Sequence, residues 1–503
     1  MEMTSKMKKR RKIITTVLCF VVLSVCASQC FAQSGTDTKK LKERQYLEII
    51  NSLYYYIQLN YVEEVDAEKL YAGALKGMLE SLDDPYSVYM PKEDWRNLSD
   101  TTTGSFGGVG LSITKPTKNV KGKPAYVEVA QPIDDSPGAR AGIQPGDKIT
   151  KIDGTDTSTI TMNEVLDRLR GTVGEPVTIS ILRGKNIQFD ITLVRALIEN
   201  PSVKYGMIRN TGYIRISEFS NNTADKVQEA IESFDRTGYD SIIIDLRNNG
   251  GGLLTAAVNI ADKFIDEGTI VATKSRLAYE NNVYTATPRK TIVDSSIPVI
   301  VLINKASASA SEILAGAFKD AHRAYLVGEN SYGKGSVQIP TPLIDNDGFK
   351  ITVAKYYSPS DTNIDKVGIP PDREVTWAPL SEEEEQAFEK IMKSTEIADY
   401  VEAHPNMTED DIGMYAVQLQ EKYDIDLTLL RKLVRNQTDR TKKARLYDLD
   451  YDIQLNAALS ILANEDIRTL TADVKTLKEI ETEREAKKAA EEASKEAEEE
   501  DLE

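Results

Sequence analysis

Segments with strand and helix periodicity alternate between residues 196 and 376, and this alternation most restricts the fold. Short runs of apolar, often β-branched residues are followed by longer segments with apolar residues at helical spacing. Strands are predicted at 212–216, 241–246 and 299–303, and helices at 224–234, 253–265 and 309–321. This order predicts an α/β core. Active sites of such sheets lie beyond the strand ends, which for strand 299–303 means the residues around Ser309.

Ser309 stands at the predicted start of a helix. Ser309 and Glu312 have the S-x-x-E spacing of a capping box, and most serines in this pattern only cap a helix. The same position also directs the free N–H groups of the helix N-terminus at whatever the serine attacks. The Ala310 amide would then stabilise an oxyanion. The spacing alone fits both interpretations.

Lys334 lies between two glycines, just before a strand-like segment. Lys334 can act as a general base at neutral pH only if its pKa falls by about 3 units, which corresponds to roughly 4 kcal/mol in the free energy of deprotonation. Burial is the usual cause of such a shift. In a continuous strand Lys334 and Gln338 share one face, where the amide of Gln338 would orient the amine without adding charge. Taken alone, a lysine in a glycine turn is usually a surface residue.

Two other motifs imitate known sites but lack a required part. Residues 328–334 have the G-x-x-x-x-G-K spacing of a phosphate-binding loop, yet Gly335 stands where that loop needs Ser or Thr. Ser112 and Lys115 have the S-x-x-K spacing of penicillin-binding enzymes, but they lie in a strand-like run instead of a helical turn. Both chemistries are therefore disfavoured.

Histidine is too scarce to support a Ser-His-Asp triad. The chain has two histidines, His322 and His404. If 309–322 is one helix, Ser309 and His322 lie about 20 Å apart along its axis. His404 lies far along the chain in a charged helical region. A histidine base for Ser309 is therefore poorly supported.

A second glycine turn follows the predicted strand 241–246. Gly250, Gly251 and Gly252 separate this strand from the predicted helix 253–265. A strand, a glycine turn and a helix often direct backbone N–H groups at an anion. Gly251 and Gly252 are therefore candidates for a second oxyanion donor. A close strand-to-helix turn without a catalytic role explains either glycine equally well.

Together these segments resemble the carboxyl-terminal processing proteases, also called tail-specific proteases. The resemblance rests on DLRNNGGGLL at 245–254, SASASEILAGA at 307–317 and VGENSYGKGSVQ at 327–338, in this order. One departure is Gly250, where the family often has proline. The resemblance implies a multidomain α/β protein whose protease core, residues 196–376, has a mixed, crotonase/ClpP-like α/β fold.

The resemblance also implies the role of each site residue. Ser309 would be the nucleophile that forms an acyl-enzyme, Lys334 the general base, and Gln338 the residue that supports the lysine. The amide of Ala310 and the turn at Gly251 and Gly252 would supply the oxyanion hole.

The first 32 residues predict an export signal. Residues 6–12 are rich in basic side chains, residues 13–25 are mostly apolar, and the segment ending at Ala32 is an acceptable cleavage site. The apolar run is short for a membrane span, which needs about 20 residues. We expect cleavage after Ala32 and a periplasmic or other extracytoplasmic location, with an uncut membrane anchor as the alternative. A lipoprotein site at Cys26 is weaker because bulky Val25 precedes it.

Cysteine content and charge exclude several classes of function. Cys19, Cys26 and Cys30 all lie in the predicted signal, so the processed chain would have no cysteine for disulfides, thiol catalysis or metal binding. Removal of residues 1–32 would take away six basic residues and one acidic residue and change the formal charge from −17 to −22. Such a charge disfavours nucleic-acid binding. We expect neither a metal ion nor a cofactor.

Residues 37–99 predict an N-terminal helical segment, with helices at 41–59 and 67–81. The phrase SLDDPYS at 81–87 ends this pattern. It resembles a phrase that the processing proteases carry just before their PDZ domain.

Residues 100–195 resemble an inserted, mainly-β PDZ domain, with a glycine loop, several strands and one helix at 162–170. Such domains add a peptide as an extra strand and hold its C-terminal carboxylate with backbone N–H groups. The residues predicted to bind the peptide are Gly107, Gly108, Val109, Gly110 and Leu111. We hypothesise that Arg168, beside the apolar stripe of the helix, senses the substrate carboxylate or contacts the protease domain. A solvated surface arginine is the alternative.

The C-terminal part predicts a helical region at 377–477 and a charged tail at 478–503. The tail is nearly all Glu, Lys and Ala, which favours a solvated helix or disorder. By resemblance, C-terminal helices of this kind help some family members to dimerise. We therefore expect a homodimer or a higher oligomer.

The expected function is that of an exported serine endopeptidase that recognises apolar C-terminal tails of protein substrates through its PDZ domain. An adaptor protein is a further candidate partner. A non-catalytic PDZ scaffold is the alternative, and a nucleotide-binding enzyme is disfavoured by Gly335.

Overall fold

The structure is a computed structural model that describes residues 35–116, 124–199, 201–377, 379–440, 442 and 445–500. The predicted signal peptide and its cysteines lie outside these residues. The chain divides into two compact units at Asp83 and Asp84. Each unit is described by itself.

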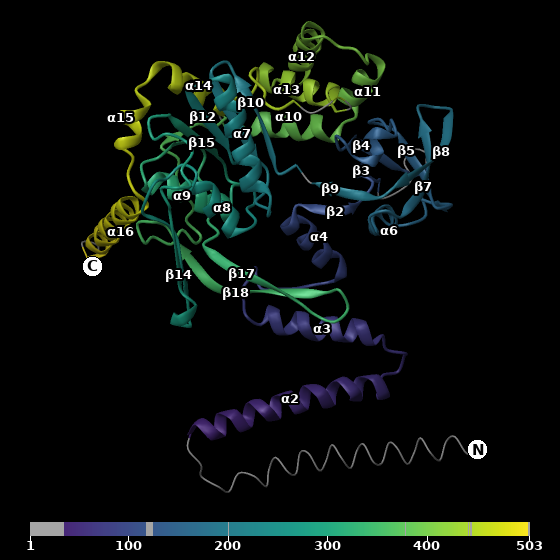
Figure 1. Ribbon diagram of the computed structural model, residues 1–503, viewed down its shortest axis with the longest axis vertical. Helices are drawn as coiled ribbons and strands as arrows, with labels where there is room; N and C mark the ends of the chain where they lie inside the picture. The colour runs from purple at the N-terminus through teal and green to yellow at the C-terminus, as the bar shows by residue number, and fades with distance from the viewer. Residues whose placement is uncertain are drawn as a thin grey trace. The chain divides into compact units, whose positions relative to one another are not determined.

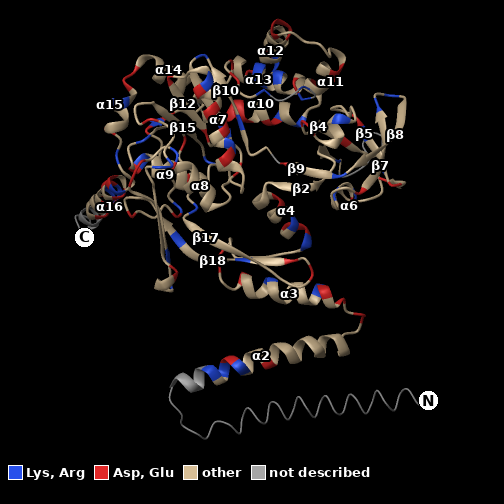
Figure 2. Ribbon diagram, viewed as in Figure 1, with Lys and Arg blue, Asp and Glu red and all other residues tan. Residues whose placement is uncertain are grey.

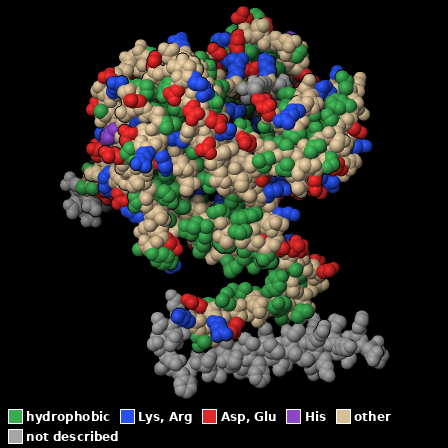
Figure 3. All heavy atoms as spheres, viewed as in Figure 1, with side chains coloured by type: hydrophobic (Ala, Val, Ile, Leu, Met, Phe, Trp, Pro, Cys, Tyr) green, Lys and Arg blue, Asp and Glu red, His purple; other side chains and the backbone are tan. Residues whose placement is uncertain are grey.

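From residue 35 on, the N-terminal unit contains two helices, α2 (Gly35–Asn60) and α3 (Ala67–Glu80) (Figure 1). Asp66 caps α3 because its carboxylate accepts hydrogen bonds from the amides of Glu68 and Lys69. The second half of α2 carries no charged residue after Glu48 (Figure 2). Its large apolar side chains are exposed to solvent (Figure 3). They include Ile49, Ile50, Leu53, Tyr55, Tyr56 and Leu59.

Within the described part of the chain, no helix is both long enough and apolar enough to cross a bilayer.

The segment predicted as a PDZ domain forms a sheet in the order β3-β4-β5-β7-β8, with β6 on β5. The strands are β3 (Leu111–Thr114), β4 (Val127–Pro132), β5 (Lys148–Ile152), β6 (Thr155–Asp156), β7 (Pro176–Arg183) and β8 (Ile187–Val194). Two helices, α5 (Pro137–Arg140) and α6 (Met162–Leu169), accompany the sheet. Its core contains Val129, Ile149, Val165 and Ile179. The chain enters through β2 (Ser105–Gly108) and leaves through β9 (Ala196–Glu199), and these two strands pair antiparallel.

The predicted α/β core is confirmed. It is a six-stranded sheet in the order β10-β11-β12-β15-β16-β19, parallel except for β10. The strands are β10 (Val203–Ile208), β11 (Thr211–Ile216), β12 (Ser241–Asp245), β15 (Val299–Ile303), β16 (Tyr325–Gly328) and β19 (Arg373–Glu374). Every residue of β12 and β15 is buried. Parallel strands that are covered on both faces consist of nearly continuous apolar residues. The sequences of β12 and β15 have this pattern, so both strands could be predicted.

Helices cover both faces of this sheet. On one face lie α7 (Thr223–Thr237), α8 (Leu254–Ala261) and α9 (Ala310–Asp320). On the other face lie α14 (Ile453–Asn464) and α15 (Ile467–Ala472), whose Leu455 and Ile461 pack with Ile243, Ile300 and Leu302 of the sheet. The core of the sheet therefore includes part of the segment predicted as a separate C-terminal helical region.

The remaining C-terminal helices have a core of their own. They are α10 (Glu382–Lys393), α11 (Glu396–Ala403), α12 (Glu409–Tyr423) and α13 (Leu427–Thr438). The last helix, α16 (Leu477–Glu500), contains most of the charged tail. Its first residue, Leu477, is buried in the core that contains α9, so the start of the tail is anchored.

A second sheet has the order β1-β18-β13-β14, with β17 also paired to β18. Its strands are β1 (Val88–Met90), β13 (Thr269–Ser275), β14 (Asn282–Thr285), β17 (Ser336–Pro342) and β18 (Gly348–Tyr357). The N-terminal helical segment predicted at 37–99 also contains a strand, which is a correction to that prediction. Residues after Asp84 supply β1, which pairs with β18, and only then α4 (Lys92–Thr103). The predicted N-terminal segment thereby contributes a strand to this second sheet.

Candidate active site

Ser309 lies between the end of β15 and the first residue of α9, as the strand and helix patterns predicted. Its backbone has φ +55° and ψ −114°. A positive φ is uncommon in a residue other than glycine, and such strain persists where the surrounding structure enforces it, often at functional sites. The turn is enforced from the neighbouring strand. Ser307 Oγ donates to the carbonyl of Leu246 (2.9 Å), and the Ala308 amide donates to the carbonyl of Asn249 (3.0 Å).

Glu312 joins the serine turn to the lysine turn. Its side chain is buried, and five hydrogen bonds reach its carboxylate, the longest of them from the Tyr356 hydroxyl to Oε2 at 3.5 Å. Oε1 accepts from Ser331 Oγ and from the Gly333 amide, both at 2.6 Å. Oε2 accepts from the amides of Ser309 (2.8 Å) and Lys334 (2.9 Å). The backbones of Ser309 and Lys334 therefore lie within hydrogen-bonding reach of one oxygen atom.

Burial raises the pKa of Glu312 above its ordinary value, because it disfavours the charged form. The donors around the carboxylate oppose this shift in part. The sequence marked Glu312 only as the second member of a capping box. Its larger role depends on residues 331–334, and no spacing rule connects them to position 312.

Lys334 is half-buried, and its Nζ lies 5.0 Å from the centre of the Tyr86 ring. Among the described residues, no hydrogen-bond partner is present for this amine. Burial lowers the pKa of Lys334, and the like charge of Lys350 lowers it further, while Glu312 and Asp84 oppose the shift. This is the direction that a lysine needs if it is to lose its proton near neutral pH.

The phrase at 81–87 positions Tyr86. Ser87 Oγ donates to Asp84 Oδ2 (2.6 Å) and accepts from the Thr352 amide of β18 (3.0 Å). This anchored turn places the Tyr86 ring beside Lys334. The sequence indicated that the phrase precedes the PDZ domain, but it gave no sign that the phrase also forms a wall of the site.

Gln338 makes other contacts than the predicted one. Its Nε2 donates to Ser336 Oγ (2.9 Å) and to Thr352 Oγ1 (3.1 Å). No hydrogen bond joins Gln338 to Lys334 within the described residues. A shared face requires an unbroken strand from Lys334 to Gln338, whereas β17 begins at Ser336 and Lys334 lies in the turn before it.

The glycine turn after β12 lies directly against Ser309. A Cβ atom on Gly251 would stand 2.7 Å from the Cβ of Ser309 and 3.0 Å from the amide nitrogen of Ala310. Gly251 and Gly252 have φ values of +106° and +136°, which favour glycine. A Cβ on Gly252 would also meet the carbonyl oxygen of Phe219 at 2.1 Å. The structure thus places Gly251 against Ser309 and the Ala310 amide, and Gly252 follows in the same turn.

The two glycines differ in the state of their N–H groups. The Gly251 amide donates to Asn249 Oδ1 (2.9 Å) and is engaged. The amides of Gly252 and Ala310 have no hydrogen-bond partner in the described part of the chain. The free N–H donor of this turn is therefore that of Gly252. Gly251 has no side chain, which allows the turn to lie against Ser309.

The predicted carboxylate loop of the PDZ domain connects β2 to β3. The carbonyls of Gly107, Val109 and Gly110 accept hydrogen bonds from the amides of Gly171 (3.2 Å), Gly138 (2.9 Å) and Ile133 (2.8 Å), respectively. These bonds fix the loop against the rest of its domain. Gly108 and Leu111 occupy the end of β2 and the start of β3.

Arg168 lies on α6 and is exposed. Its neighbours Asp167 and Arg170 form ion pairs with Arg96 and Asp100 of α4. Arg168 forms no ion pair with any described residue. Its guanidinium is therefore accessible to a ligand, as the hypothesis about this residue requires.

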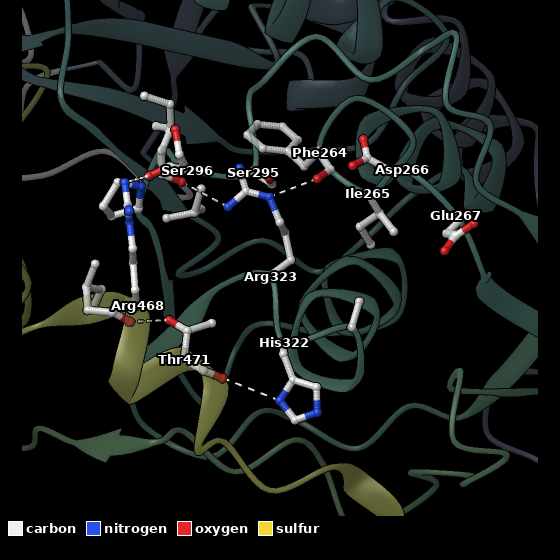
Figure 4. A pocket seen from close by; sticks show the side chains of 15 residues that line it. Phe264, Ile265, Asp266, Glu267, Ser295, Ser296, His322, Arg323, Arg468 and Thr471 are labelled. Atoms are coloured by element: carbon white, nitrogen blue, oxygen red, sulfur yellow. Dashed lines mark hydrogen bonds between the residues drawn. The ribbon is translucent and has the colours of Figure 1, made fainter.

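A separate cavity of about 450 Å³ lies beyond the C-terminal end of α9, away from Ser309 (Figure 4). Arg323 crosses it and donates to the carbonyls of Phe264 (2.8 Å) and Ile297 (3.0 Å). His322 Nδ1 lies 3.4 Å from the carbonyl oxygen of Thr471. Because His322 follows the last turn of the helix that Ser309 begins, it does not reach the serine.

We predict that Glu312→Gln slows the reaction of Ser309 with a fluorophosphonate by on the order of 10²-fold, since small displacements of reacting groups have effects of this size. A glutamine keeps one acceptor oxygen but turns an NH₂ group toward backbone donors. The labelling rate, followed by mass spectrometry, measures the effect.

The matched control is Glu384→Gln. Glu384 accepts from the amide of Ser381 (2.8 Å) in a capping box of the same spacing, on α10. Labelling of Ser309 should stay at the wild-type rate in this variant. Equal rates in Glu312→Gln and wild type would show that Glu312 does not organise the site.

Three segments match the sequence models of known families. Residues 210–375 match peptidase family S41, residues 128–183 match a PDZ domain, and residues 13–94 match the N-terminal domain of the activating protease CtpB. The first match contains Ser309, Lys334 and the glycine turn. The matched PDZ segment contains Arg168 but not the loop at 107–111.

Whole-chain relatives agree with these matches. A carboxy-terminal-processing protease of Bartonella bacilliformis is 36% identical over 414 residues, which cover 81% of this chain and 92% of the relative. The carboxy-terminal processing protease CtpA of Bacillus subtilis is 30% identical over 434 residues, 85% of this chain and 90% of the relative. The solved structure of a photosystem II D1 C-terminal processing protease is 29% identical, with a TM-score of 0.39, over 65% of this chain and 92% of that one.

The order of the motifs, the α/β core with its PDZ domain and the Bartonella and Bacillus relatives lead to one conclusion. The chain belongs to the carboxyl-terminal processing proteases, serine-type peptidases of family S41 that act on protein substrates.

Proposed function

We propose that this protein is an exported endopeptidase that recognises C-terminal tails and cleaves its substrates with a Ser309–Lys334 dyad. The observation that carries the proposal is the Glu312 carboxylate. It accepts the backbone amides of both residues on one oxygen atom, although they are far apart in the sequence.

In the proposed reaction, neutral Lys334 takes the proton of Ser309 as Oγ attacks the scissile carbonyl. The negative charge on the tetrahedral intermediate is stabilised by the free amides of Ala310 and Gly252. Lys334 then returns the proton to the leaving amine, and an acyl-enzyme forms. Water, deprotonated by Lys334, hydrolyses this ester in the second half of the reaction.

Gln338 is proposed to support Lys334 once substrate is bound. Its amide now contacts Ser336 and Thr352, which keeps it on the strand that follows the lysine turn. Catalytic hydrogen bonds are often long or unformed in a free enzyme and tighten in the substrate complex. A rearrangement of this one side chain would suffice.

For tail recognition we propose the loop formed by Gly107, Gly108, Val109, Gly110 and Leu111, with Arg168 as an additional contact for the C-terminal carboxylate. The fixed carbonyls of the loop and the unpaired, exposed guanidinium support this assignment. The substrates would carry apolar C-termini that add to the domain as an extra strand.

The second candidate is a non-catalytic scaffold, and the environment of Lys334 argues against it. Burial of this amine lowers its pKa, and burial of an amine without a hydrogen-bond partner costs free energy of folding. A scaffold would gain nothing from that cost. A nucleotide-binding loop is disfavoured on separate grounds. The Glu312 carboxylate occupies the amides of Gly333 and Lys334 that such a loop would offer to a phosphate.

The function is tested by incubating the purified chain with an unstructured protein that ends in an apolar tail. Wild type should cleave it, and Ser309→Ala and Lys334→Ala should reduce kcat at least 10³-fold. The same substrate with an amidated C-terminus should be cleaved with a higher KM. Equal cleavage by wild type and both variants would refute the dyad, and no cleavage by wild type would favour the scaffold.

The pH dependence gives a second test. Since only neutral Lys334 can accept a proton, kcat/KM should rise as the pH passes the lowered pKa of this amine. Lys350→Gln removes a like charge, so protonated Lys334 becomes more favourable and its pKa rises. The rising limb should therefore move to higher pH.

The control for this shift is Lys355→Gln. Lys355 lies on the same strand, β18, and is exposed. Its removal should leave the profile in place. A profile that does not move in Lys350→Gln would mean that the limb does not report Lys334.

We also propose that the protein is a homodimer or higher oligomer, with an adaptor as a further partner. The proposal is supported by the exposed apolar side chains of α2. The full chain should sediment as an oligomer at micromolar concentration, and replacement of Ile50 and Leu53 by Glu should shift it toward the monomer. Monomeric wild type would refute this assignment.

A further inference from the structure

Arg247 follows β12 and directly precedes the glycine turn, and acceptors occupy all five of its N–H donors. Nε and Nη2 donate to the two oxygens of buried Asp245 (2.9 and 2.7 Å). Nη1 and Nη2 donate to the two oxygens of Asp452, both at 2.6 Å. Nη1 also donates to Gln454 Oε1 (3.1 Å). Two carboxylates thus hold one guanidinium, each by a bidentate contact.

Asp452 comes from outside the segment that matches the peptidase family, which ends at residue 375. It is the N-cap of α14, and its Oδ1 also accepts from the Leu455 amide (3.0 Å). The helix is packed on the sheet through buried Leu455. Asp452 is therefore held in place by its helix and is itself only 20% exposed. Gln454 is fixed in turn, since its Nε2 donates to the carbonyl of Val375 (2.8 Å).

The residues that follow Arg247 form the turn behind Ser309. The Asn248 amide donates to Asn304 Oδ1 (2.9 Å). Asn249 holds the Gly251 amide on its side chain, and its carbonyl accepts from the Ala308 amide and from Ser311 Oγ. A displacement of Arg247 would therefore pass through the backbone to the turn that carries the free Gly252 amide and to the serine turn beside it.

We propose that Asp452 is a positioning residue of the active site. It acts through Arg247 to hold the 248–252 turn in the conformation that presents the Gly252 amide. The catalytic unit then extends past the peptidase segment and includes α14. Arg247 is nearly buried, and without Asp452 only the Asp245 carboxylate would compensate its charge. The effect on catalysis rests on the proposed function, but the effect on the turn does not.

The variant that tests this is Asp452→Asn. Asparagine caps a helix as well as aspartate does, so α14 keeps its N-cap while Arg247 loses a carboxylate. Amide hydrogen exchange, followed by mass spectrometry in peptides that cover 246–254 and 304–310, should become at least several-fold faster. In tail cleavage, kcat should fall by about 10-fold or more, while KM should stay within about 2-fold, because the turn serves the transition state. Asp452→Glu should recover part of kcat.

The matched control is Asp426→Asn. Asp426 caps α13 in the same way, with its carboxylate accepting from the Leu429 amide (2.9 Å), and it forms no ion pair with a described residue. Exchange in the two turn peptides and kcat should both match wild type in this variant. If Asp452→Asn does not fold, Gln454→Ala removes only one acceptor from Arg247 and should accelerate exchange in the same peptides to a smaller extent.

The outcomes separate this inference from the proposed function. An inactive wild type would refute the proposed function, and the exchange measurement would still decide the role of Asp452. Unchanged exchange in Asp452→Asn would overturn the inference even if the wild type is an active protease. A fall in kcat that Asp426→Asn shares would also overturn it, because the loss would then follow from general destabilisation.

Discussion

The Glu312 carboxylate is the contact on which the site depends. Burial of a charged group costs free energy unless hydrogen bonds replace its hydration. Here the replacement comes from the amides of Ser309, Gly333 and Lys334 and from Ser331 Oγ. Because these donors belong to two separate turns, the need to satisfy one buried charge also fixes the distance between the serine turn and the lysine turn. Glu312, the second member of a capping box, therefore also links the turn of Ser309 to the turn of Lys334.

Other elements of the structure shape the surroundings of Ser309 and Lys334. The glycine turn approaches Ser309 so closely that a side chain on Gly251 would clash with it, and the same side chain would stand 3.0 Å from the amide nitrogen of Ala310. The turn at 84–87 places Tyr86 beside Lys334 and helps to exclude water from the amine. Asp452 holds Arg247 from the far side of the sheet. Segments before and after the peptidase region thus both contribute to the site.

Sequence reasoning was most successful where a local pattern has a local physical cause. The buried strands β12 and β15 read as apolar runs, and Ser309 follows β15 as predicted. It failed where a contact joins distant segments, as for Glu312, Tyr86 and Asp452. It also failed where regular geometry was assumed, because Lys334 lies before the start of β17 at Ser336 and the alternation of that strand does not extend to it.

The sequence by itself determined the α/β core, the serine at a helix start, the lysine in a glycine turn and the family resemblance. These follow from periodicity and residue type, which short stretches of chain express on their own. Only the tertiary structure decided which glycine has a free amide, what lowers the pKa of Lys334 and which helices complete the core. Those properties depend on burial and on hydrogen bonds between residues far apart in the chain, and such contacts exist only once the whole protein has folded.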